Sequence, residues 1–240
     1  MPPPRRDWIF VTGQPGCGKT TAVQRLCRAL QEAGLPVQGF ITQEVRGTSN
    51  GGATRSGFDI VTVPDGRRVR LARKQGFPST WPSTGAYRVD VASLDQVAVP
   101  TLALPSSGSS SRSTGCDESP TRADLSKGNT QQHNDPVIYQ YYVLDEIGRM
   151  ELHSEAFRTA VRNLLNGACD DEYDGNAPRI RLVGAVTAPR YGHRVAFCDW
   201  VTTQDGVQVH HLTKKTREQV TLDLLDYIQT HWIDDGGKRI

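Results

Sequence analysis

The most informative segment of the 240-residue chain is Gly13-Gln14-Pro15-Gly16-Cys17-Gly18-Lys19-Thr20, which matches the pattern G-x-x-x-x-G-K-[ST]. Glycines at this spacing let successive backbone N–H groups curl around phosphate oxygens at the N-terminus of a helix. In that arrangement Lys19 meets the β and γ phosphates of a nucleotide, and Thr20 offers its hydroxyl to Mg²⁺. A chance match in a glycine-rich loop is the competing interpretation, and the flanking sequence decides between the two.

The flanking residues have the composition that a phosphate-binding loop requires. Apolar residues 8–11 directly precede the loop and predict a strand, and apolar side chains recur at helical spacing after Lys19. Gly34 and Pro36 then predict the end of that helix. The order strand, loop, helix favours nucleotide binding, with contacts expected from Gly13, Gln14, Pro15, Gly16, Cys17, Gly18, Lys19, Thr20 and Thr21.

The rest of the chain predicts alternating strands and helices. A strand is expected at 37–42, and a β-hairpin is expected from two apolar runs joined by Pro64-Asp65-Gly66. Further elements are predicted as strands at 58–63, 69–71, 87–91, 137–144, 180–186 and 207–212, and as helices at 94–99, 154–165 and 217–232. This order predicts one α/β domain over 1–240, with a mainly parallel sheet covered on both faces.

One long segment does not fit this alternation. Residues 105–135 are dominated by Ser, Thr, Gly, Asn and charged residues, with almost no large apolar side chain. Such a composition buries too little surface to offset the entropy of ordering. We therefore predict a disordered surface insertion there.

An acidic pair follows the apolar run 137–144. Asp145 would stand at the carboxyl end of a central strand, where an aspartate can provide Mg²⁺ with a second protein ligand beside Thr20. Glu146 could hold the attacking water and accept its proton. A solvated strand end is the simpler interpretation, but the pair occurs together with the glycine-rich loop and favours hydrolysis.

Several arginines could stabilise charge on the transferring phosphoryl group. Arg149 lies three residues beyond Glu146, while Arg190, Arg194 and Arg217 follow a predicted strand or begin the last helix. Spacing alone does not choose among them, and each could equally be a surface ion-pair partner.

Composition limits the possible partners. The formal net charge is +2, which does not require a polyanionic partner, and the basic run at residues 67–74 lacks the interleaved aromatic residues of an RNA-binding motif. Nucleic acid is therefore an unlikely ligand. The first residues lack the apolar core of a signal peptide, no run is long enough to span a membrane, and five scattered cysteines favour reduced thiols. We expect an intracellular, cytoplasmic protein without a membrane partner.

Four segments together resemble the cancer-related nucleoside-triphosphatase family, which is related to the Thep-type nucleotide phosphatases. They are residues 13–21, 39–46 (GFITQEVR), 55–59 (RSGFD) and 145–152 (DEIGRMEL). The resemblance covers most of the chain and implies a RecA-like P-loop core that hydrolyses nucleoside triphosphates with Mg²⁺ and broad base tolerance. It also strengthens the case for Arg149, which lies inside a matching segment. In the segment 212–217, relatives tend to carry Thr-x-x-Asn-Arg, whereas this chain has Thr216 in place of the asparagine.

Two other functions use the same residues. A kinase would pass the γ-phosphate to a hydroxyl if a lid excluded water, and the arginine-rich chain after Pro189 could form such a lid. A nucleotide-controlled binding module would hydrolyse slowly and use the bound triphosphate to order a partner-facing loop.

Overall fold

The computed structural model describes residues 7–49, 52–104, 139–166, 179–189 and 193–234. The predicted insertion at 105–135 and the candidate Arg190 lie outside these ranges.

A nine-stranded sheet forms the centre of the described part of the chain. Its order is β5-β6-β4-β3-β2-β7-β8-β1-β9. The parallel half comprises β2 (Val37–Ser49), β7 (Tyr139–Ile147), β8 (Arg179–Thr187), β1 (Asp7–Gly13) and β9 (Val207–His211). The antiparallel half comprises β3 (Gly52–Thr62), β4 (Arg68–Arg73), β6 (Tyr87–Val89) and β5 (Ser83–Thr84).

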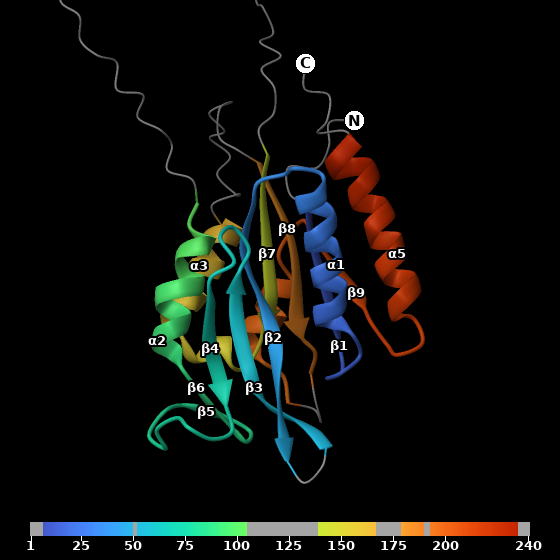
Figure 1. Cartoon of the computed structure of the whole chain (residues 1–240). Coiled ribbons are helices and arrows are strands. Elements are labelled where there is room, and N and C mark those ends of the chain that lie inside the picture. The colour runs from blue at the N-terminus through green and yellow to red at the C-terminus, as the bar shows by residue number, and fades with distance from the viewer. Residues whose placement is uncertain (1–6, 50–51, 105–138, 167–178, 190–192, 235–240) are drawn as a thin grey trace, which may run out of the picture.

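Helices cover both faces of this sheet (Figure 1). On one face lie α1 (Lys19–Glu32) and α5 (Arg217–Ile228), which continues as a π-helical segment over Gln229–Asp234. On the other face lie α3 (Glu155–Asn166), α4 (Ala196–Thr202) and a helical stretch from 91 to 102 made of α2 (Val91–Ser93) and two short segments. The predicted three-layer α/β fold with a mainly parallel core is confirmed.

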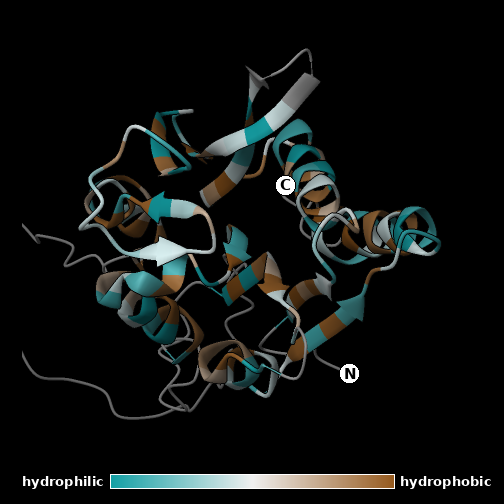
Figure 2. Cartoon of the chain, turned by 90° about the horizontal axis from the view of Figure 1, so that it is seen from below, coloured by the Kyte–Doolittle hydropathy of each residue, from teal (hydrophilic) through white to brown (hydrophobic). Residues whose placement is uncertain are grey.

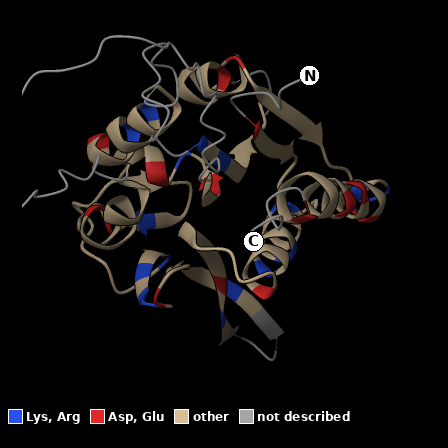
Figure 3. Ribbon diagram, turned by 90° about the horizontal axis from the view of Figure 1, so that it is seen from above, with Lys and Arg blue, Asp and Glu red and all other residues tan. Residues whose placement is uncertain are grey.

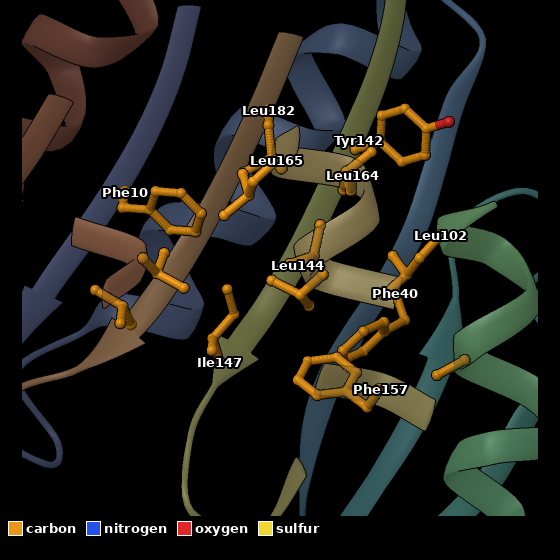
Figure 4. Close-up of a cluster of buried hydrophobic side chains, with 14 of the residues drawn as sticks. Phe10, Phe40, Leu102, Tyr142, Leu144, Ile147, Phe157, Leu164, Leu165 and Leu182 are labelled. Carbon is orange, nitrogen blue, oxygen red and sulfur yellow. The ribbon is translucent and has the colours of Figure 1, made fainter. Parts of the chain in front are cut away.

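Strand β1 shows why the sheet is covered twice. Trp8 and Phe10 belong to the apolar cluster under α3, whereas Ile9 and Val11 belong to the cluster under α1. Side chains alternate between the two faces of a strand, so a continuous apolar run can fill both cores. Figure 4 shows the α3-side cluster, in which the rings of Phe40 and Phe157 meet edge to face at 6.0 Å.

The predicted hairpin is formed by β3 and β4, and the predicted helices correspond to α1, α3, α5 and the 91–102 stretch. The longer β2–β3 hairpin was not predicted, because the second half of β2 (residues 43–49) is polar and lacks an apolar face. Helix α4 was not predicted either, because its seven residues are too few for a helical period to be recognised.

The parallel strands end at the lower edge of the molecule in Figure 1, where α1 begins. Figure 2 views this edge directly and shows apolar strand residues enclosed by helices with hydrophilic outer faces. From the opposite side, Figure 3 shows acidic and basic residues interspersed on the helices, in keeping with the small net charge. The carboxyl edge of an open α/β sheet is the usual position of a ligand site.

Candidate active site

The glycine-rich loop (residues 13–21) connects β1 to α1. Gly13 has a φ of 149° and Gly18 a φ of 111°, values that favour glycine. A Cβ atom on Gly13 would lie 2.3 Å from the carbonyl oxygen of Leu212, so this position also excludes any side chain for lack of space. Gly18 immediately precedes α1, which leaves the first N–H groups of the helix facing the loop.

Lys19 points back into the loop. It is 8% exposed, and its Nζ donates a hydrogen bond to the carbonyl oxygen of Gly13 at 3.2 Å. The same nitrogen lies 3.6 Å from Oε2 of Glu146, with which it forms an ion pair. The loop lysine and the second residue of the acidic pair therefore meet directly.

Asp145 is fully buried within β7, and both of its carboxylate oxygens have partners. Oδ1 accepts a hydrogen bond from the Thr20 hydroxyl at 3.2 Å, and Oδ2 accepts from the Thr42 amide at 3.4 Å and hydroxyl at 3.3 Å. Burial, followed by the nearby charge of Glu146, raises the pKa of Asp145 to about 7, against the effect of these hydrogen bonds. The juxtaposed oxygen atoms of Thr20 and Asp145 are ligand types that Mg²⁺ prefers.

Glu146 faces the cavity rather than the core. Its side chain is 26% exposed, and its Oε1 accepts a hydrogen bond from Thr187, the last residue of β8. Lys19 and Thr187 thus hold the two oxygens of one carboxylate. A carboxylate fixed in this way can orient a water molecule in the adjoining space.

Glu151 is a further carboxylate that sequence analysis did not single out. It is only 4% exposed, lines the cavity, and begins a short 3-10 helix at Glu151–His153. Burial and the charge of Glu146 raise the pKa of Glu151 to about 8, although the Gly148 amide donates to it. The residue lies within the segment 145–152, but its sequence spacing gave no hint that the chain returns to the site.

A cavity of about 970 Å³ joins these groups. Its lining includes most of the glycine-rich loop together with Thr42, Glu146, Glu151 and Thr187. Of the predicted loop residues, Gln14 and the buried Cys17 do not line it, and Asp145 lies beneath its surface.

Only some of the candidate arginines line the cavity. Arg149, three residues after Glu146, is exposed and lines the cavity. Arg217, the first residue of α5, lines the cavity beside Gly18. Arg194 lies outside the lining and approaches Asp199 at 4.0 Å. Two arginines on the β2–β3 hairpin, Arg46 and Arg55, also line the cavity and were not predicted. They were missed because a hairpin between polar strands was not expected.

Thr216 has a local structural role. Thr213 and Thr216 exchange hydrogen bonds between their hydroxyls and backbone amides ahead of α5. This turn places Arg217 against the glycine-rich loop.

Within the described ranges, no group of three or more His, Cys, Asp or Glu residues is arranged to hold a metal ion by itself. In the same ranges, none of the helices combines the length and apolar composition needed to cross a bilayer.

Comparison with known proteins gives a consistent result. A family model described as NTPase matches residues 8–109. The human cancer-related nucleoside-triphosphatase is 32% identical over 92% of this chain and 96% of its own length. Nucleoside-triphosphatase THEP1 of Methanothermobacter thermautotrophicus is 35% identical over 92% of this chain and 95% of its own.

Two solved structures are also similar. The solution structure of a human cancer-related nucleoside triphosphatase has a TM-score of 0.63 and 31% identity, covering 94% of this chain and 98% of that one. The crystal structure of THEP1 from Aquifex aeolicus has a TM-score of 0.60 and 22% identity, covering 93% and 99%. The second similarity supports the fold alone.

Proposed function

The chain belongs to the cancer-related nucleoside-triphosphatase family, and from this premise we propose that it hydrolyses nucleoside triphosphates to diphosphate and phosphate. One observation carries the proposal. At the carboxyl edge of the sheet, Lys19 is in direct contact with Glu146, and Thr20 with Asp145, which lies 125 residues further along the chain. This is the combination that triphosphate hydrolysis requires.

Phosphate binding is assigned to the glycine-rich loop. The amides that precede and begin α1 would hold phosphate oxygens, and Lys19 would exchange part of its contact with Glu146 and Gly13 for the β and γ phosphates. Thr20 and Asp145 would hold Mg²⁺, because their oxygens already lie within hydrogen-bonding distance at the floor of the site. A bound Mg²⁺ neutralises negative charge on phosphate oxygens.

We assign to Glu146 the role of orienting the attacking water and accepting its proton. Its carboxylate is oriented by Thr187 and Lys19 and opens into the cavity, so it can accept the proton as water attacks the γ-phosphorus. Arg149, exposed at the same cavity, is assigned the stabilisation of charge on the transferring phosphoryl group. We further propose broad base tolerance, as the family resemblance implies.

A Glu146→Gln substitution tests this mechanism. The amide keeps the size of the side chain but cannot accept a proton, so we expect turnover to fall at least about tenfold while triphosphate affinity changes little. Phosphate release and binding of a non-hydrolysable triphosphate are measured on the same preparation. Glu155→Gln, at an exposed carboxylate on α3 outside the cavity, is the matched control. Unchanged turnover would remove Glu146 from the mechanism.

The kinase and binding-module alternatives gain no support from the names of the relatives. A γ-labelled triphosphate separates them from hydrolysis. Label in free phosphate supports the proposal, and label in an added nucleoside or nucleotide supports a kinase. Capture of a protein partner only with a non-hydrolysable triphosphate supports a binding module.

We also propose a cytoplasmic location. The three cysteines in the described ranges, Cys17, Cys27 and Cys198, are buried free thiols, which suits a reducing compartment.

A further inference from the structure

The cavity extends beyond the acidic pair onto the other face of the sheet. The glycine-rich loop leads into α1 on one face. Phe58 and Tyr87, which also line the cavity, pack against the apolar cluster under α3 on the opposite face. The cavity therefore turns around the end of β7, and we call its part on the α3 side the far lobe, which is lined by Glu44, Arg46, Arg55, Phe58, Tyr87 and Arg149.

Arg55 is held in place before any ligand binds. Its Nε donates to Oε2 of Glu44 at 2.6 Å, and its guanidinium lies 5.4 Å from the centre of the Phe58 ring. Arg46 donates to the other oxygen of Glu44 at 2.8 Å. The hydrogen bond from Arg55 is the main cause that lowers the pKa of Glu44, so this carboxylate stays ionised. One carboxylate thus positions two guanidinium groups that retain further N–H donors.

The charge of the far lobe is positive. Its lining contains three arginines and a single carboxylate, Glu44. Arg149 is exposed within the same lining. Guanidinium groups bind phosphates and carboxylates through paired hydrogen bonds, so the lobe suits an oxyanion.

The floor of the far lobe is aromatic. The rings of Phe58 and Tyr87 meet edge to face at 5.4 Å, and both are only half-buried. Leu71 and Met150 extend the apolar lining beside them. A floor of this kind suits a planar ring rather than a bare ion.

The cavity is large for a single small ligand. The volume of about 970 Å³ lies at the upper end of the range of roughly 300–1,000 Å³ that sites for one small molecule occupy. A triphosphate held by the glycine-rich loop would direct its γ-phosphate toward Glu146 and leave the far lobe beyond it open.

We propose that the far lobe binds a second small ligand, a planar ring that carries a phosphate or carboxylate, while a triphosphate occupies the glycine-rich loop. The inference rests on the proposed function only in assigning the triphosphate to that loop. It concerns binding and includes no transfer step.

Adenosine monophosphate is a suitable probe, because it combines a ring with one phosphate. The protein is first saturated with a non-hydrolysable ATP analogue and Mg²⁺, and AMP is then titrated by calorimetry and by ligand-observed NMR. We expect AMP to bind the loaded protein, and Arg55→Ala to weaken AMP binding at least about fivefold while leaving the affinity for the analogue unchanged.

Arg68→Ala is the matched control. Arg68 is an arginine of β4 that is ion-paired with Asp59 and lies outside the cavity lining, so its removal should leave AMP binding unchanged. Phe58→Leu is a second variant, which should weaken AMP binding without changing the charge of the lobe. Thermal melting shows that each variant is folded.

Three outcomes would overturn the inference. The first is that AMP at millimolar concentration does not bind the loaded protein. The second is that neither Arg55→Ala nor Phe58→Leu weakens AMP binding. The third is that inorganic phosphate binds the loaded protein as tightly as AMP does. If the analogue itself fails to bind, the proposed function fails. In that case AMP could still bind the unloaded protein, and a loss of this binding in Arg55→Ala would still support a ligand site in the far lobe.

Discussion

The two halves of the sheet contribute to the cavity in different ways. In the parallel half, Lys19 and Asp145 are buried and form hydrogen bonds with Gly13 at the end of β1, with Thr20 of α1 and with Thr42 of β2. The antiparallel half also includes the end of β2 that pairs with β3 alone, and there Arg46 and Arg55 are largely exposed on the β2–β3 hairpin and are held mainly by one carboxylate, Glu44. The first group belongs to a rigid core, and the second to a projecting surface element.

This difference indicates how the chemistry is divided. Catalytic groups must keep their geometry when a ligand binds, and a doubly covered parallel sheet provides that rigidity. Groups that select a ligand can adjust, and a hairpin outside the helical layers permits this. We therefore expect substitutions in the parallel half to affect turnover and stability strongly, and those in the antiparallel half to affect mainly ligand selection.

The largest predicted effect is a loss of kcat/KM when Lys19 is removed, compared with the removal of a lysine in the antiparallel half. Lys19→Ala removes the only lysine in the cavity lining of the described residues, and we expect kcat/KM to fall about 10²- to 10³-fold, as for loss of other groups that stabilise transition-state charge. Lys74→Ala, at an exposed lysine that lies 5.6 Å from the centre of the Tyr87 ring, should change kcat/KM less than about threefold. Phosphate release is measured under steady-state conditions. Similar losses in the two variants would contradict the division between the halves.

A second comparison uses two glycines with positive φ. Gly13 in the parallel half combines a φ of 149° with a backbone oxygen 2.3 Å from its virtual Cβ, whereas Gly66 in the β3–β4 turn has a φ of 67° and open space around it. Gly66→Ala should lower the free energy of unfolding only by what a side chain costs in the left-handed conformation, about 1–2 kcal/mol. Gly13→Ala must also displace the chain at Leu212, so we expect a loss of about 3 kcal/mol or more.

Urea unfolding of both variants, followed by circular dichroism, gives these free energies of unfolding. Equal losses would mean that the backbone near Leu212 yields easily, and that the loop is less rigid than the packing indicates.

The parallel half could largely be predicted from the sequence. Residues 8–21 carry a strand, a glycine pattern and a helical period in one continuous segment, so local rules suffice. The prediction that Asp145 and Glu146 reach this loop needed only the rule that parallel strands end at one edge of a sheet. The contacts of Thr20 with Asp145 and of Lys19 with Glu146 agree with it, while the catalytic roles of these residues stay predictions.

The antiparallel half could not be predicted in the same way. Arg46 and Arg55 come together because β2 and β3 pair beyond the covered part of the sheet, with a register shift between Val45 and Arg46. Polar strands carry no strong apolar alternation, so neither the pairing nor the register is visible in the sequence. Glu151 was missed for a related reason, since its burial depends on how the chain folds back after β7.

The smallest predicted effect concerns this buried carboxyl group in the parallel half. The pKa of Glu151 is raised from 4.5 to about 8 in the folded protein, chiefly by burial. Between these two values the folded state keeps a proton that the unfolded chain has released, so stability falls as the pH rises from about 5 to 8. Glu151→Gln cannot release a proton, and its stability relative to the wild type should increase over this interval by at least about 1 kcal/mol.

Thermal melting at pH 5, 6, 7 and 8, without nucleotide or divalent metal, measures this difference. Glu155→Gln, on the exposed face of α3, serves as the control and should differ from the wild type by the same amount at every pH. Asp145, whose pKa is also raised, is present in all three proteins, so the difference from the wild type isolates Glu151 together with its coupling to Asp145. A pH-independent difference for Glu151→Gln would show that Glu151 is ionised throughout, and that Glu146 shares the cavity with a second full negative charge.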